Sequence, residues 1–138
     1  MNILIIDAQG GGLGKQLITS IKQNMDTAVI TAVGTNSTAT AAMLKAGADY
    51  AATGENAVIV ACRKADVIVG PVGIVIADSL FGEITPAMSV AVGQSNAKRI
   101  LIPFNQCDNV IAGLPDFSVA KAVKSAVEEL MKIVRQSV

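Results

Sequence analysis

The sequence predicts an α/β fold with a doubly wound, mostly parallel sheet, Rossmann-like, in three layers α/β/α. Patterns typical of strands alternate with patterns typical of helices along the 138 residues. The main strands are continuous apolar runs, such as "ILII" and "DVIVG", which indicates that helices cover both faces of the sheet. The last helix is predicted by apolar residues that recur at steps of three and four.

The expected elements follow one another without a linker or repeat. Apolar and β-branched runs predict strands at residues 3–6, 27–33, 48–53, 66–70, 99–103 and 109–113. Helical patterns predict helices at residues 13–25, 39–46, 54–64, 86–93 and 116–134. We expect Ser37 or Thr38 to cap the second helix, and Thr85, followed by Pro86, to cap the fourth.

Composition restricts the classes of function. Eleven basic and eleven acidic residues cancel and are scattered, so we expect no binding to nucleic acid. No apolar run reaches the roughly 18 residues of a membrane span and no leader pattern is present, so we expect a cytoplasmic protein without a membrane partner. The sequence has no histidine and no paired-cysteine motif, so we expect no metal site. At this length we expect residues 1–138 to form a single Rossmann-like nucleotide-binding domain.

The stretch "DAQGGGLGK" joins the first strand to the first helix. Glycine N–H groups at the start of a helix are well placed to bind an anion. The Walker A motif and its partition-ATPase variant require a hydroxyl residue where Gln16 stands, and the pattern G-x-G-x-x-G fails at Lys15. The spacing G-x-x-x-G-x-G of short-chain dehydrogenases matches Gly12 and Gly14 but has Ala8 at its first position. The loop therefore predicts anion binding without identifying the ligand.

Five loops are expected to meet at the carboxyl ends of the strands, where parallel sheets bind ligands. The end of the second strand carries neither an acid for ribose hydroxyls nor an arginine for a 2′-phosphate, and Asn36 is the candidate ribose contact. The sequence does not identify the cofactor, and NAD(P) or another nucleotide is the candidate. The predicted cofactor-binding residues are Gly10, Gly11, Gly12, Leu13, Gly14, Lys15, Thr35, Asn36, Ser37, Gly54, Glu55, Gly70, Pro71 and Asn105.

Three further features bear on the predicted site. We expect Asp7, at the end of the first strand, to orient the glycine loop through backbone N–H groups. Glu83 and Thr85 lie in the "GEITP" loop, which is placed to project into the crevice. The apolar stretch "PVGIVIADSL" is either buried core or a subunit interface, and we expect a homo-oligomer.

Several longer segments together resemble a known family. They are "IIDAQGGGLGKQL", "AVGTNSTATAAMLKAGAD", "ATGENA", "DVIVGPVGIVIADSLFGEITPAM" and "ILIP". They resemble a family of small bacterial proteins known as domain of unknown function 3842, over nearly the whole chain. The resemblance implies a single Rossmann-like domain, and it assigns no reaction and no functional residue.

The sequence leaves three functions open. The first is a non-catalytic or regulatory domain that binds a nucleotide or an NAD(P)-type dinucleotide. The second is an enzyme that works as an oligomer, either a small oxidoreductase or a protein that handles phosphate esters with Lys15 and Glu83. The third is a structural subunit without a ligand. The only tyrosine, Tyr50, lacks the lysine four residues on that short-chain dehydrogenases use.

Overall fold

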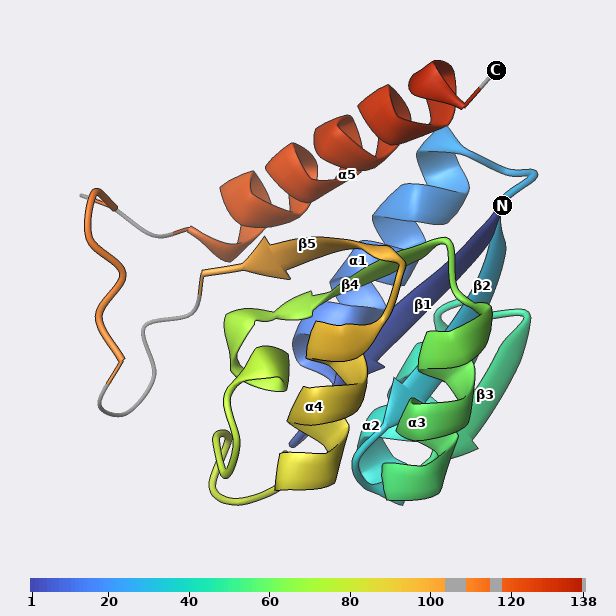
Figure 1. Ribbon diagram of the computed structural model, residues 1–138. Helices are drawn as coiled ribbons and strands as arrows, with labels where there is room; N and C mark the ends of the chain where they lie inside the picture. The colour runs from blue at the N-terminus through green and yellow to red at the C-terminus, as the bar shows by residue number, and fades with distance from the viewer. Residues whose placement is uncertain (104–108, 115–117, 138) are drawn as a thin grey trace.

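The computed structural model describes residues 1–103, 109–114 and 118–137 and is shown in Figure 1. The strands are β1 (Asn2–Asp7), β2 (Val29–Gly34), β3 (Tyr50–Thr53), β4 (Val67–Pro71) and β5 (Lys98–Ile102). The helices are α1 (Gly12–Asn24), α2 (Ser37–Lys45), α3 (Glu55–Lys64), α4 (Pro86–Gln94) and α5 (Val119–Gln136), with a short 3₁₀ helix, η1 (Val72–Val75).

The five strands form one parallel sheet in the order β3-β2-β1-β4-β5. The central strand β1 pairs with β2 on one side, where Ile5 lies opposite Ala32, and with β4 on the other, where Ile5 lies opposite Val69. The direction of winding reverses between β1 and β4. In open sheets of this kind the ligand crevice lies beyond the carboxyl ends of the strands at that reversal, which places the glycine loop after β1 at the crevice.

Helices cover both faces of the sheet, as the continuous apolar strands predict. Ile3 and Ile5 of β1 belong to a core shared with α1, α2 and α5, whereas Leu4 and Ile6 belong to a second core shared with α3 and α4. Figure 1 shows α3 and α4 side by side on one face of the sheet and α1 and α5 on the other. These four residues of β1 are at most 1% exposed. The strand that leads into the glycine loop is therefore packed on both faces.

The longest helix, α5, confirms the predicted amphipathic pattern. Val123, Ala126, Val127 and Leu130 are buried against the core that contains α1. The rest of the helix is largely charged or polar and exposed. No helix among the described residues is long and apolar enough to cross a membrane.

Two sequence predictions about these elements are wrong. The strand expected at residues 109–113 is not formed: Val110 is 85% exposed, so this run buries no face, and Gly113 turns the chain at a φ of 86°. The cap of α2 is Asn36, whose side chain accepts a hydrogen bond from the N–H of Ala39, and not Ser37 or Thr38. The helix begins at Ser37, two residues before the expected range, because asparagine caps as well as serine does.

Candidate functional site

The glycine loop is anchored by the buried carboxylate of Asp7. Its Oδ1 accepts a hydrogen bond of 2.8 Å from the N–H of Ala8, and its Oδ2 accepts one of 2.7 Å from the N–H of Gly14. Asp7 ends β1 and Gly14 lies in the first turn of α1, so one side chain fixes the strand, the loop and the helix relative to one another. The predicted orienting role of Asp7 is confirmed.

Two of the four glycines are required by the fold. Gly11 precedes α1 with a φ of 74°, and a Cβ at this position would lie 2.8 Å from the backbone of Ala39 in α2. A Cβ on Gly14 would lie 2.9 Å from Cγ of Met43 and 3.1 Å from Cβ of Asp7. Gly11 therefore makes the turn, and Gly14 allows α1 to pack closely against α2 and β1.

The other two glycines, Gly10 and Gly12, border open space. A Cβ at either position would meet nothing within 4 Å. No described residue accepts a hydrogen bond from the N–H of Gly10, Gly12 or Leu13, whereas every other N–H from residue 8 to residue 15 has an acceptor. The loop thus leaves three nearby donors unpaired at the positive end of a 13-residue helix. We call the N–H groups of Gly10, Gly12 and Leu13 the amide cradle.

A small pocket of about 100 Å³ lies beside the amide cradle. Residues 7–13 line it from the β1 side, and Pro71 and Leu80 line it from the β4 side. It therefore lies where the winding of the sheet reverses. A dinucleotide does not fit within this volume, but a phosphate group does.

The carboxylate of Glu83 joins the glycine loop to the end of β2. Its Oε1 accepts hydrogen bonds from the N–H of Gln9 at 3.0 Å, from Oγ1 of Thr35 at 2.7 Å and from Nδ2 of Asn36 at 2.7 Å. Nδ2 of Asn36 also donates to the carbonyl oxygen of Gln9 at 2.9 Å. Thr35 and Asn36 are thus brought to the glycine loop as predicted, through a residue about 48 positions away in the chain.

The two carboxyl groups of the site have pKa values shifted in opposite directions. Burial raises the pKa of Asp7; hydrogen bonds from Gly14 and Ala8 oppose this, and the negative charge of Glu83 adds to it, so the pKa lies above its ordinary value. Burial also raises the pKa of Glu83, but hydrogen bonds from Thr35, Gln9 and Asn36 together lower it below its ordinary value. The hydrogen bonds on Glu83 thus favour its ionised form, whereas burial disfavours the ionised form of Asp7.

Residues 76–85, which we call the Glu83 segment, have an unusual backbone. Asp78, Leu80 and Phe81 have φ values of 66°, 56° and 58°, and Gly82 follows with a φ of 82°. Residues other than glycine rarely adopt this left-handed region, at a cost of about 1 kcal/mol or more each. Burial of Leu80 and Ile84 in the core with α3 and α4 holds the segment in place. The apolar stretch is therefore at least partly core, and its role as a subunit interface stays a prediction.

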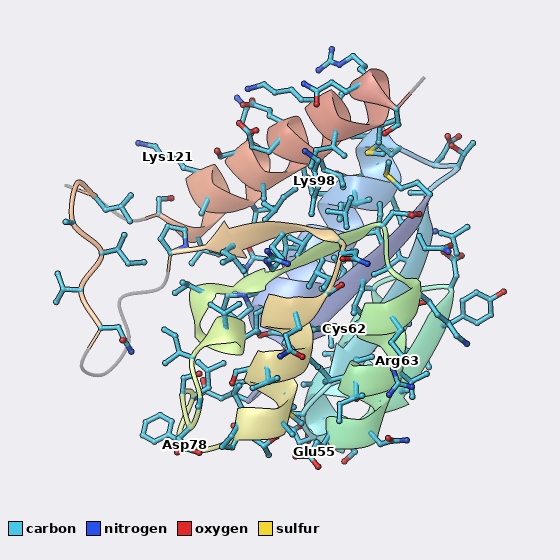
Figure 2. All side chains as sticks on the ribbon, viewed as in Figure 1. Glu55, Cys62, Arg63, Asp78, Lys98 and Lys121 are labelled. Atoms are coloured by element: carbon cyan, nitrogen blue, oxygen red, sulfur yellow. The ribbon has the colours of Figure 1, made fainter. Side chains whose placement is uncertain are left out.

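The predicted residues Gly54 and Glu55 lie at the start of α3 and do not line the pocket beside the amide cradle. Glu55 accepts a hydrogen bond of 2.6 Å from Oγ1 of Thr85, and the N–H of Gly54 donates to the carbonyl oxygen of Gly34. Thr85 also caps α4 by accepting from the N–H of Met88, which confirms its predicted role. Figure 2 shows Glu55 and Asp78 at the end of the molecule where α3 and α4 begin. These contacts tie that end of the fold together.

The remaining predicted residues have different surroundings. Pro71 lines the pocket, whereas Gly70 serves packing, because a Cβ there would lie 2.5 Å from the carbonyl oxygen of Ile6. Lys15 and Ser37 are exposed, and Lys15 forms no ion pair with a described residue. Asn105 lies outside the described residues. The assignment of all these residues to a cofactor stays a prediction.

Five lining or bridging residues are missing from the predicted cofactor-binding set: Asp7, Ala8, Gln9, Leu80 and Glu83. Gln9 adopts a φ of 53°, which no sequence pattern indicates for glutamine. Leu80 and Glu83 reach the site only because the Glu83 segment folds back over the carboxyl end of β1. The position of Glu83 in the "GEITP" loop was the one sequence signal that pointed to this contact.

Three larger hollows among the described residues do not include the glycine loop. The largest, of about 580 Å³, lies between α3 and α4 and is lined by Cys62 and Arg63 among others; both are labelled in Figure 2. Burial raises the pKa of the Cys62 thiol to about 11, so it stays protonated and unreactive at neutral pH. Among the described residues, no three cysteine or acidic side chains are grouped to hold a metal ion.

Comparison with protein families matches residues 2–135 to the family described as Domain of unknown function (DUF3842). The chain belongs to the DUF3842 family. The family suggested by the sequence segments is thereby confirmed. Comparison with curated proteins finds no match. The roles of the DUF3842 loop residues therefore have to be argued from their own contacts.

Two solved structures are similar to this DUF3842 chain. One is the apo, histidine-tagged saccharopine dehydrogenase (L-Glu forming) from Saccharomyces cerevisiae, at 14% identity over 76% of this chain and 22% of that chain, with a TM-score of 0.49. The other is a dodecameric FMN-dependent UbiX-like decarboxylase from Escherichia coli O157:H7, at 17% identity over 94% of this chain and 75% of that chain, with a TM-score of 0.46. The chain spans about a fifth of the length of the dehydrogenase.

The different roles of Gly14 and Gly12 can be tested by a matched pair of substitutions. Gly14→Ala forces a methyl group against Met43 and Asp7, and we expect it to lower the free energy of unfolding by about 1–3 kcal/mol. Gly12→Ala adds the same methyl group in open space, and we expect a change within about 0.5 kcal/mol. Urea unfolding followed by circular dichroism measures both. Equal losses would contradict the assignment of Gly14 to packing.

The hydrogen bonds to Glu83 predict a pH-dependent stability. Because its pKa in the folded chain lies below the ordinary value of 4.5, Glu83 stabilises the fold above that pH, and this contribution is lost as the pH falls through the folded-state pKa. We expect Glu83→Gln to cost about 1 kcal/mol at pH 7, since the site is partly open to solvent. In urea unfolding at pH 7 and again at a pH well below 4.5, the difference between the two proteins should be smaller at the lower pH.

Asp78→Asn is the control for this measurement. Asp78 lies in the same segment, and its carboxylate accepts no hydrogen bond from a described residue. We expect the control to remain within about 0.5 kcal/mol of the wild type at both pH values. A pH-independent difference between the wild type and Glu83→Gln would show that the charge of Glu83 does not contribute to stability.

Proposed function

We propose that this DUF3842 protein binds a nucleotide, with a phosphate group on the amide cradle. The observation that carries the proposal is the selective lack of acceptors: Gly10, Gly12 and Leu13 have unpaired N–H groups, while the rest of the loop is paired. An oxyanion that accepts from several backbone N–H groups would satisfy these donors. Gly10 and Gly12 leave room for its close approach.

The size of the pocket and the positive charge around it support the binding of a phosphate group. The pocket of about 100 Å³ beside the cradle suits a single phosphate group, with the rest of the nucleotide lying outside it. The N-terminus of α1 supplies roughly half a positive charge. Lys15 follows the loop directly, is exposed, and has no described carboxylate partner. Its ammonium group is free to neutralise a phosphate in solution.

The site favours binding over catalysis. A general base needs a pKa near the working pH, whereas the hydrogen bonds on Glu83 keep its pKa below the ordinary value. Three donors already bind Oε1 of Glu83, which further weakens it as a base. The sequence has no histidine to take this role. We therefore propose that the protein binds a mononucleotide or an NAD(P)-type dinucleotide in a non-catalytic, regulatory role.

A thermal-shift measurement tests the proposal. We expect at least one of NAD, NADP, FAD, ATP and GTP, at millimolar concentration, to raise the melting temperature by several degrees. A ligand at 100 times its Kd adds about 2.7 kcal/mol to the stability of the folded state. Gly12→Ala should abolish the shift, because its methyl group occupies the space beside the unpaired N–H groups.

Two further arms complete the thermal-shift test. Ser125→Ala changes an exposed residue of α5, and we expect it to keep the shift, which would show that the loss in Gly12→Ala is specific to the glycine loop. Inorganic phosphate separates binding of a bare anion from binding of a nucleotide. If no nucleotide shifts the melting temperature of the wild type, the proposed function is wrong.

A further inference from the structure

The structure places a carboxylate at the end of β2, although β2 and the residues after it contain no acid. Strand β2 ends in Gly34 and continues through Thr35 and Asn36. Oε1 of Glu83 lies 2.7 Å from Oγ1 of Thr35 and 2.7 Å from Nδ2 of Asn36. The charge that the sequence lacks at this place is therefore supplied by a segment that follows β4.

An acid at the end of the second strand has a defined use in dinucleotide-binding folds, where it accepts hydrogen bonds from the ribose hydroxyls. That use depends on where the carboxylate lies and not on which segment supplies it. We propose that Glu83 recognises the ribose, so that the ligand is a nucleotide with free 2′- and 3′-hydroxyl groups. This inference rests on the proposed nucleotide binding at the amide cradle.

The two oxygens of Glu83 are in different situations. Oε1 accepts three hydrogen bonds, from the N–H of Gln9 and the side chains of Thr35 and Asn36. Oε2 accepts none from a described residue, and the residue is partly exposed. One oxygen thus positions the carboxylate, and the other is available to a hydroxyl donor.

Asn36, the ribose contact expected from the sequence, is occupied by other contacts. Its two amide hydrogens are used by the carbonyl oxygen of Gln9 and by Oε1 of Glu83. Its Oδ1 accepts from the N–H of Ala39 as the cap of α2. Asn36 is therefore a positioning residue that orients Glu83, and Glu83 takes the contact with the ribose.

The Glu83 segment holds the carboxylate in place before any ligand binds. The N–H of Gly82 donates to the carbonyl oxygen of Asp78, and the N–H of Asp78 donates to that of Ile84. Leu80, within the left-handed turn, and Ile84, after it, are buried. A carboxylate that is already positioned gains more from a ribose hydroxyl than one that must first be ordered.

A carboxylate at this place discriminates between nucleotides. Hydroxyl groups donate to it, so removing the 2′-hydroxyl loses a hydrogen bond to a charged acceptor, which corresponds to about tenfold or more in affinity. A 2′-phosphate brings negative charge against negative charge. The protein should therefore prefer ATP to 2′-deoxy-ATP, and NAD to NADP.

Isothermal titration calorimetry on the full chain tests this inference. For wild-type protein we expect Kd values at least about tenfold lower for ATP than for 2′-deoxy-ATP, or for NAD than for NADP. Glu83→Gln keeps an acceptor for Gln9, Thr35 and Asn36 but replaces Oε2 or its equivalent by a donor. We expect it to weaken ATP or NAD binding about tenfold, to leave 2′-deoxy-ATP within about twofold, and to lose the preference.

The matched control is Asp78→Asn, which removes the same charge from the same segment, at a carboxylate that forms no hydrogen bond with the described loops of the site. We expect it to bind each nucleotide as the wild type does. Circular dichroism establishes that each variant is folded, and the comparison of ribose with deoxyribose in the wild type needs no variant.

The possible outcomes distinguish a failure of this inference from a failure of the proposed nucleotide binding on which it rests. Equal affinities for ATP and 2′-deoxy-ATP, and for NAD and NADP, in the wild type would overturn the role of Glu83 while nucleotide binding stands. Tighter binding by Glu83→Gln would also overturn it, since the carboxylate would then compete with the ligand for the donors. If no nucleotide binds the wild type, both the inference and the proposed function fall.

Discussion

The site depends on the buried carboxylate of Asp7, which fixes the glycine loop. It accepts hydrogen bonds from the N–H groups of Ala8 and Gly14, and so joins the end of β1 to the first turn of α1. The left-handed Gly11 and the close packing of Gly14 follow from this short connection. Burial of Asp7 raises its pKa and disfavours its charge, and the two backbone hydrogen bonds offset part of that cost. The same geometry leaves the N–H groups of Gly10, Gly12 and Leu13 without a described acceptor.

Glu83 adds the second fixed group and brings in a distant part of the chain. Its carboxylate binds the loop after β1 and the loop after β2, so residues from three segments meet beside the reversal of the sheet. The left-handed backbone of the Glu83 segment is costly, and strain of this kind is commonly retained near functional sites. The cradle and the carboxylate then offer two different contacts, N–H donors for a phosphate and an acceptor for hydroxyls. A nucleotide carries both groups.

Local patterns were sufficient for most of the fold. The apolar runs predicted β1, β2, β4 and β5, and the spacing of apolar residues predicted α5, because burial on both faces or on one stripe leaves a clear signal. The run at 109–113 misled because apolar composition does not ensure a neighbouring strand. In the site, Asp7 was predictable from its place between strand and loop. The contacts of Glu83 with Thr35 and Asn36 were not, since they depend on how the chain returns after β4 and on a backbone that Leu80 and Phe81 rarely adopt.

The central claim is that the unpaired N–H groups of Gly10, Gly12 and Leu13 hold the phosphate of a nucleotide. It is tested most directly by ¹H–¹⁵N spectra recorded while ATP or NAD is added to ¹⁵N-labelled protein. We predict the largest amide shifts at these three residues, changing together along one binding curve. Shifts that leave the three amides unchanged and appear instead between α3 and α4, where the largest hollow lies, would contradict the claim.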